Sequence, residues 1–151
     1  MYQPKHVRAE EIVPPEVFEA LKTTPWKIWS LFDDRILKGL DVLWEHLTTL
    51  AGQKIKMTIN TWFWGGNLTR CGYRPPPVRE GESMWGQHPR GGAVDIHVNL
   101  FTPVQVRHEI LTNQEKFSPY FRCVEKDTPT WTHLAMENYG MSSKGIYLVN
   151  P

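Results

Sequence analysis

The chain has 151 residues, a formal net charge of +1 at pH 7 and 40% hydrophobic residues. These values predict one folded domain over residues 1–151, and the lack of a basic block disfavours nucleic acid and anionic membranes as partners. No apolar run is long enough to span a membrane. The polar stretch from Met1 to Ile12 lacks the apolar segment of a signal peptide, so we expect a protein that is cytoplasmic at synthesis.

The N-terminal part of the chain carries helix signals. Residues 1–13 are expected to form an irregular or extended arm, and the prolines in Pro14-Pro15 and Thr24-Pro25 each begin a short helix. Either Asp33 or Asp34 can cap a longer helix. The buried face of that helix is an apolar stripe formed by Ile36, Leu40, Leu43, Leu47 and Leu50. These elements are predicted to be scaffold.

The middle of the chain alternates strands with loops. Lys54–Trp62 and Ala93–Val98 have the alternation of polar and apolar residues that is typical of strands. Between them lie a turn at Cys71–Arg74, three prolines that prevent regular structure, and a polar loop over residues 78–87. This loop leads directly to the second strand.

The second half of the chain predicts one helix and a hairpin. Thr102-Pro103 begins the helix, with a cap and a proline in its first turn, and the helix should run to about Thr112. Residues 121–125 and 130–136 are two strand candidates separated by a turn, and residues 145–149 are a last short strand. Together the elements predict an α+β fold in which N-terminal helices pack on a small, mainly antiparallel sheet.

An aspartate inside an apolar strand points to a metal. Asp95 lies within Ala93–Val98, where a carboxylate is costly to bury without a cation. His88 lies seven residues upstream across two glycines and can fold back beside it, and a later strand offers His133. Two imidazoles and a carboxylate are ligands that zinc accepts. The alternative is a loop histidine, a capped strand aspartate and an unrelated second histidine.

The spacing of these residues resembles a known family. The zinc peptidases of the D-Ala-D-Ala carboxypeptidase and L-alanyl-D-glutamate endopeptidase group, which share a fold with lysostaphin and the hedgehog domain, carry Ser-x-His-x-x-Gly-x-Ala-x-Asp and a late Trp-x-His. The matching residues here are His88, Gly91, Ala93, Asp95, Trp131 and His133. Gly86 stands at the serine position. The resemblance covers residues 31–150, leaving residues 1–30 as an arm with short helices, and it implies Zn²⁺ bound by the two histidines and the aspartate.

The same family often carries a Ser-Gly-Tyr-Arg-like turn whose arginine faces the substrate. Cys71–Arg74 matches this turn with cysteine in place of serine, so the resemblance gives Arg74 a substrate-binding role. A guanidinium suits that role because it can hold a carboxylate or support charge on the attacked carbonyl. The alternative is a solvated loop arginine, and Arg70 is the second choice for the same role.

The resemblance leaves the general base open. Many family members place a carboxylate three residues before the last histidine, but that position is Thr130 here. Phage-associated relatives have a glutamate on the paired strand, and Glu125 fits this place if the hairpin loop sets it opposite Trp131 or His133. Asp127, nearer the turn, is the second choice. Glu125 would be an ordinary solvent-facing residue if the register differed.

Three further residues, His97, Cys71 and Cys123, carry side chains of types that can bind metals. His97 should share a strand face with Asp95 and could support the site, although a partly solvated histidine is the simpler interpretation. Cys71 and Cys123 form no Cys-x-x-Cys motif, so we expect reduced thiols and no cysteine ligand.

By resemblance, the expected activity is that of a zinc metallopeptidase that hydrolyses a peptide bond in the stem peptides of bacterial cell-wall peptidoglycan. It would act as a carboxypeptidase or an endopeptidase, like a phage endolysin released at lysis or carried on a virion. The alternative from another class is a zinc-binding domain that binds cell wall or a protein partner without catalysis, which Thr130 favours. A third is a structural domain without metal.

Overall fold

The described residues form one mixed sheet of five strands. A computed structural model describes residues 1–137 and 145–150. The strands are β1 (Met57–Thr58), β2 (Ala93–Val98), β3 (Cys123–Glu125), β4 (Thr132–Ala135) and β5 (Tyr147–Val149), in the spatial order β1-β2-β4-β3-β5. Every neighbouring pair is antiparallel except β3 and β5, which are parallel. The α+β class and the mainly antiparallel sheet are confirmed.

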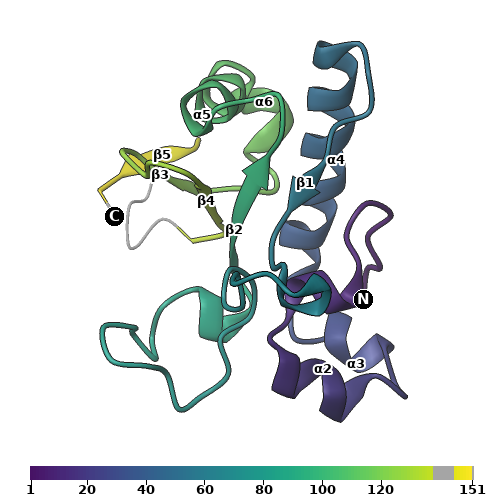
Figure 1. The fold of residues 1–151 in the computed structure, drawn as a ribbon. Coiled ribbons are helices and arrows are strands. Elements are labelled where there is room, and N and C mark those ends of the chain that lie inside the picture. Colours follow the sequence, from purple (N-terminus) through teal and green to yellow (C-terminus); the bar gives the residue numbers. More distant parts are fainter. Residues whose placement is uncertain (138–144, 151) are drawn as a thin grey trace.

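The described residues also form six helices and two 3-10 turns. The helices are α1 (Ala9–Ile12), α2 (Pro15–Leu21), α3 (Trp26–Trp29), α4 (Asp34–Ala51), α5 (Pro103–Thr112) and α6 (Gln114–Phe117), and the turns are η1 (Trp62–Trp64) and η2 (His88–Arg90). Figure 1 shows α4 running alongside β1. The helices α5 and α6 lie near one end of the sheet, and α2 and α3 lie near the end of α4 at which that helix begins. Among the described residues, none of these helices is both long and apolar enough to cross a membrane.

The long helix α4 begins and ends as its sequence predicts. The Asp33 side chain accepts a hydrogen bond from the Arg35 amide, and Gly52 closes the helix in the left-handed conformation, with φ of 64°. Four leucine and isoleucine positions of the predicted stripe are fully buried. The prediction is wrong for Leu50, which lies in the last turn of the helix and is 53% exposed.

Other differences follow from long-range pairing. The strand expected over residues 54–62 shrinks to β1, because the Asn60 amide leaves the sheet and donates to the Glu11 carbonyl. Part of the arm that was expected to be irregular coils into α1, and α6 was not predicted. The hairpin strands begin later than expected, at Cys123 and Thr132. The last strand is present as β5.

The sheet has one face packed against the helices. Val94, Leu134 and Val124 face one another across β2, β4 and β3, and none of the three is exposed to solvent. Successive residues of a strand point to opposite faces, so the next row must lie on the other face. That second row begins with Asp95 opposite His133. The fold thus places the predicted metal ligands on the face turned away from the main core.

Candidate metal centre

The candidate site is built on a row of polar residues across three strands. Asp95 of β2 lies opposite His133 of β4, and both side chains are buried. The β3–β4 register pairs Val124 with Leu134, and carrying it one residue further sets Glu125 opposite His133. This is one of the two registers that the sequence left open. All three side chains therefore project from the same face of the sheet.

The third ligand candidate comes from the loop before β2. His88 opens the 3-10 turn η2, which ends at Gly91 in the left-handed conformation, with φ of 68°. A side chain at Gly91 would collide with the Leu31 carbonyl, and the Gly91 carbonyl accepts a hydrogen bond from the Asp33 amide at the start of α4. The glycine is therefore needed both for the turn and for its close approach to α4.

The His88 ring is oriented by a backbone carbonyl. Its Nδ1 lies 2.7 Å from the carbonyl oxygen of Gly72, and a carbonyl can only accept a hydrogen bond. Nδ1 therefore carries the proton, and Nε2 faces the other two candidate ligands without one. Burial lowers the pKa of His88, so the neutral ring that a metal requires is favoured. A second hydrogen bond of this kind commonly orients histidine ligands in metal sites.

His88, Asp95 and His133 meet closely enough to hold one ion. One ligand atom of each lies within 4.8 Å of the others. His88 Nε2 is 3.3 Å from His133 Nδ1 and 3.4 Å from Asp95 Oδ2. Ligands about 2.0–2.1 Å from a tetrahedral ion are about 3.3–3.4 Å apart, so these two separations fit such an ion, whereas the 2.7 Å between His133 Nδ1 and Asp95 Oδ1 is a hydrogen-bond distance. The donor set and its spacing therefore fit a metal.

Asp95 is held as a carboxylate. Burial opposes its ionisation, but the close contacts of His133 and His88 with its carboxylate outweigh that effect and hold the pKa of Asp95 well below its usual range. His133 Nδ1 is 2.7 Å from Asp95 Oδ1. A further hydrogen bond of 2.9 Å reaches Oδ2 from the Arg74 guanidinium. The negative charge that a cation needs is therefore present at neutral pH.

Arg74 lies beside the candidate ligands and lines the cleft at their surface. Besides its bond to Asp95, its Nε donates to the carbonyl of Arg70 at 2.8 Å. The Arg70 guanidinium instead holds Glu82 through two hydrogen bonds of 2.9 and 2.6 Å, and it is not among the residues that line this cleft. Arg74 is therefore the arginine that the structure brings to the site, while Arg70 fastens the following loop.

The cleft over the ligands has a volume of about 320 Å³. Its lining residues are Arg74, Gly81, Glu82, Ser83, Gly86, Gln87, His88, Pro89, Asp95, Glu125, Trp131 and His133. Of the residues considered from sequence, Asp127 and His97 are not in this lining. Asp127 is exposed in the turn after β3, with φ of 61°, and His97 pairs with Thr58 at the other end of β2. Trp85 is 84% exposed and also lies outside the lining.

Three contributors to the site were not found from sequence. Gly72 supplies the carbonyl for His88, and a side chain there would collide with the Ile12 carbonyl. Asn60, fully buried, accepts the Cys71 amide and so fixes the turn that carries Gly72. Glu82 fastens the rim through Arg70. For Gly72, Asn60 and Glu82, the one local sequence signal was the glycine of the turn. The partners of these three residues lie more than ten residues away along the chain.

Both cysteines are free thiols, and among the described residues neither belongs to the group of side chains that could hold a metal ion. Burial, together with the charge of Asp95, raises the pKa of Cys71 to about 11. Burial raises the pKa of Cys123 to about 11 as well. A thiolate is the form that binds metals, and neither group forms one readily at neutral pH. The candidate ligand atoms of the site are therefore nitrogen and oxygen.

Comparison of the chain with protein-family models, with curated proteins and with solved structures gives no match. The likeness to the zinc peptidases therefore depends on the motif residues themselves. Among these, His133 lies 38 residues after Asp95 in the sequence, yet His88, Asp95 and His133 lie together as one buried group.

Proposed function

We propose that the protein is a zinc-dependent peptidase that cleaves stem peptides of peptidoglycan. The observation that carries the proposal is the row of Asp95, His133 and Glu125 across one face of the sheet, completed by His88. It combines a three-ligand site with a carboxylate in the same cleft. Catalytic zinc sites commonly have three protein ligands and a position left for water or substrate.

The identity of the metal is inferred from the donors. Two neutral imidazoles and one carboxylate suit zinc, whereas calcium and magnesium take mainly oxygen ligands. His88 and His133 would bind through Nε2 and Nδ1, the atoms that face each other, and Asp95 through its carboxylate. A zinc ion held there would supply the Lewis acidity that polarises a scissile carbonyl and acidifies water.

The chain's own residues would supply the remaining chemistry. Glu125 lines the cleft and would accept the proton of the attacking water at a carboxylate oxygen, then pass it to the nitrogen of the leaving amine. Trp131 lies in the same lining and offers a flat apolar wall to the substrate peptide. Arg74 keeps Asp95 in place and presents positive charge at the rim.

Metal analysis and product analysis test this function together. Purified protein should contain one zinc per chain, and single replacements His88→Ala, Asp95→Ala and His133→Ala should each remove most of it while the fold persists. Incubation with purified peptidoglycan should release new amino groups that mass spectrometry assigns to one bond of the stem peptide. Zinc without cleavage of any stem peptide would instead favour the non-catalytic binding domain. A full zinc complement in all three variants would refute the ligand assignment.

A further inference from the structure

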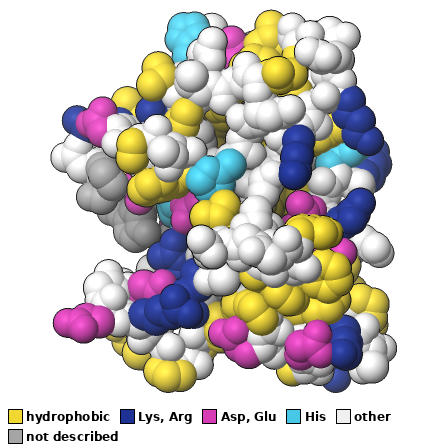
Figure 2. Space-filling view, in the orientation of Figure 1, with side chains coloured by type: hydrophobic (Ala, Val, Ile, Leu, Met, Phe, Trp, Pro, Cys, Tyr) yellow, Lys and Arg dark blue, Asp and Glu magenta, His cyan; other side chains and the backbone are white. Residues whose placement is uncertain are grey.

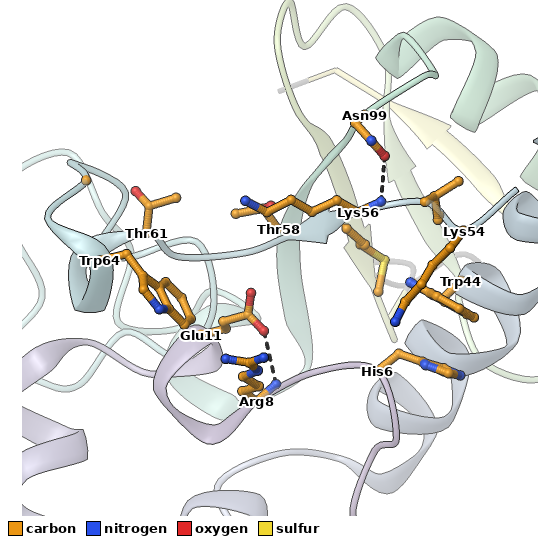
Figure 3. A pocket seen from close by; sticks show the side chains of 13 residues that line it. His6, Arg8, Glu11, Trp44, Lys54, Lys56, Thr58, Thr61, Trp64 and Asn99 are labelled. Carbon is orange, nitrogen blue, oxygen red and sulfur yellow. Dashed lines mark hydrogen bonds between the residues drawn. The ribbon is translucent and has the colours of Figure 1, made fainter.

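A second hollow lies away from the candidate metal centre. It has a volume of about 770 Å³, within the range of ligand-binding pockets, and shares no lining residue with the smaller cleft. We call it the β1 groove. Figure 3 shows residues 54–58 along one side and the arm at residues 6–11 along the other, with Trp44 of α4 near one end and Trp64 of η1 near the other.

The β1 groove follows a strand edge. In the order β1-β2-β4-β3-β5, β1 is an outermost strand and pairs only with β2 among the described strands. An edge strand can accept an additional extended chain through its outward-facing backbone groups. Groove residues 54–58 would match about five residues of such a chain, roughly 17 Å at about 3.4 Å per residue.

The lining of the β1 groove combines an apolar floor with a positive rim. Ile55 and Met57 are nearly fully buried, whereas Lys54 and Lys56, which alternate with them, are exposed. Arg8 adds a third cation from the arm, 5.8 Å from the centre of the Trp64 ring. Within the part of the chain that the structure describes, none of these three cations has an ion-pair partner within 4.0 Å.

One carboxylate faces the three cations. Glu11 lines the same groove, where its Oε2 accepts the Arg8 amide at 3.1 Å as part of the α1 cap, and its single negative charge offsets only one of the three cations. Asn99, also in the lining, uses its side-chain oxygen for the Lys56 amide at 2.5 Å. The rim therefore keeps an excess of positive charge that an acidic ligand would neutralise.

We propose that the β1 groove binds an extended acidic peptide, which adds to β1 as a further strand. Alternate side chains of a strand point to opposite faces, so the bound peptide should alternate apolar and acidic residues. Its apolar side chains share a face with Ile55 and Met57, and its carboxylates lie opposite Lys54 and Lys56. The groove is a site separate from the proposed peptidase centre and needs no metal.

The test uses a fluorescein-labelled peptide of sequence Glu-Val-Glu-Val-Glu-Val and fluorescence anisotropy with the full chain. The double variant Lys54→Glu, Lys56→Glu should bind about tenfold or more weakly, because two attractive charge pairs become repulsive. The matched control Lys22→Glu, Lys27→Glu has the same charge change on exposed residues outside the groove and should bind like the wild type. Circular dichroism establishes that each variant is folded.

A backbone test separates strand addition from simple charge attraction. Two further peptides carry N-methyl groups on all glutamates or on all valines, since only one of these sets can donate its amides to β1 in a given strand direction. Strand addition predicts that one peptide loses binding and the other keeps it. Equal binding by both, no binding of the parent peptide, or binding only of an acidic polysaccharide such as alginate would overturn the proposal. The variant His133→Ala should bind the peptide like the wild type. A failure of the proposed metal site can therefore be distinguished from a failure of the groove proposal.

Discussion

Glu125 is the residue on which the proposed hydrolysis depends most directly. It lines the cleft, and the β3–β4 register sets it opposite the ligand candidate His133. Glu125→Gln keeps the size of the side chain but cannot accept a proton, so we expect hydrolysis to fall by about 10²–10⁴. Zinc content should be unchanged, and the free energy of unfolding should change by less than about 1 kcal/mol. Rates of peptide release and metal analysis provide the measurement.

Asp127 provides the matched control for this prediction. It is exposed, lies outside the cleft lining and has φ of 61°, a conformation that asparagine adopts readily. Asp127→Asn should therefore keep both its fold and its activity. Loss of activity in Asp127→Asn with full activity in Glu125→Gln would reverse the assignment of the base.

Arg74 has a role that metal affinity can reveal. Its hydrogen bond of 2.9 Å to Asp95 Oδ2 orients a ligand candidate, and removal of such supporting groups commonly weakens metal binding by about 10–100-fold. Arg74→Ala should show this loss in a zinc competition assay with a chelator, while Arg74→Lys should recover part of it. The exposed Arg79→Ala should bind zinc like the wild type. Unchanged zinc affinity with a lower kcat/KM would assign Arg74 to the substrate alone.

At the scale of elements, local sequence patterns predicted what local forces decide. The caps of α4 and α5 and the bounds of β2 follow from residues within each segment. The length of β1 and the register of β3 on β4 do not, because they depend on partners tens of residues away. The hairpin register stayed open between two choices, and only the paired structure selects the one that sets Glu125 opposite His133.

The candidate site shows the same division. The three ligand candidates could be predicted because an aspartate inside an apolar strand, together with two histidines, has few explanations other than a bound cation. The residues that hold these ligand candidates in place could not be predicted. The Gly72 carbonyl and the Asn60 side-chain oxygen act through contacts with backbone geometry that leaves little trace in sequence. The hydrogen bond from Arg74 to Asp95 likewise could not be predicted, because it depends on how the intervening loop folds.

The loop over residues 78–87 depends on one ion pair. Arg70 holds Glu82 in a two-bond contact, which lowers the pKa of Glu82 to about 2. Because the folded pKa lies below the unfolded one, near 4.5, the pair stabilises the protein above about pH 4.5 and loses this effect as the pH falls through about 2. Glu82→Gln should cost about 1 kcal/mol at pH 7, a modest value because the pair lies near the surface.

Urea unfolding of the wild type and Glu82→Gln at several pH values measures this effect. The difference in free energy of unfolding should shrink between about pH 4.5 and pH 2. Glu80→Gln, an exposed neighbour without the bidentate contact, serves as the control. A constant difference across this range would show that the ion pair does not stabilise the loop.

The whole molecule is tied together by its N-terminal arm. Asp41, buried on α4, accepts the amides of Lys5 and His6 and the hydroxyl of Tyr2. Beyond this anchor the arm forms one side of the β1 groove, and its Ile12 carbonyl accepts the Tyr73 amide beside the candidate metal centre. The candidate metal centre and the β1 groove therefore both adjoin an arm that one buried carboxylate anchors. Figure 2 shows that hydrophobic side chains also gather on the surface around α2, α3 and the nearby turn.

Removal of this anchor should affect stability and both regions together. Asp41→Ala leaves the arm's donors without their charged acceptor, so we expect a loss of about 2–4 kcal/mol in the free energy of unfolding. Tyr2→Phe deletes only one of these bonds and should cost about 1 kcal/mol. Asp41 raises the pKa of Tyr2 to about 12, above the ordinary value of 10.0, so this smaller cost should persist up to about pH 10 and vanish as the pH rises through 12. Urea unfolding measures both costs, and zinc and peptide binding by Asp41→Ala should weaken together. If the free energy of unfolding of Asp41→Ala equalled that of the wild type, the contacts of Asp41 with the arm would not stabilise the protein.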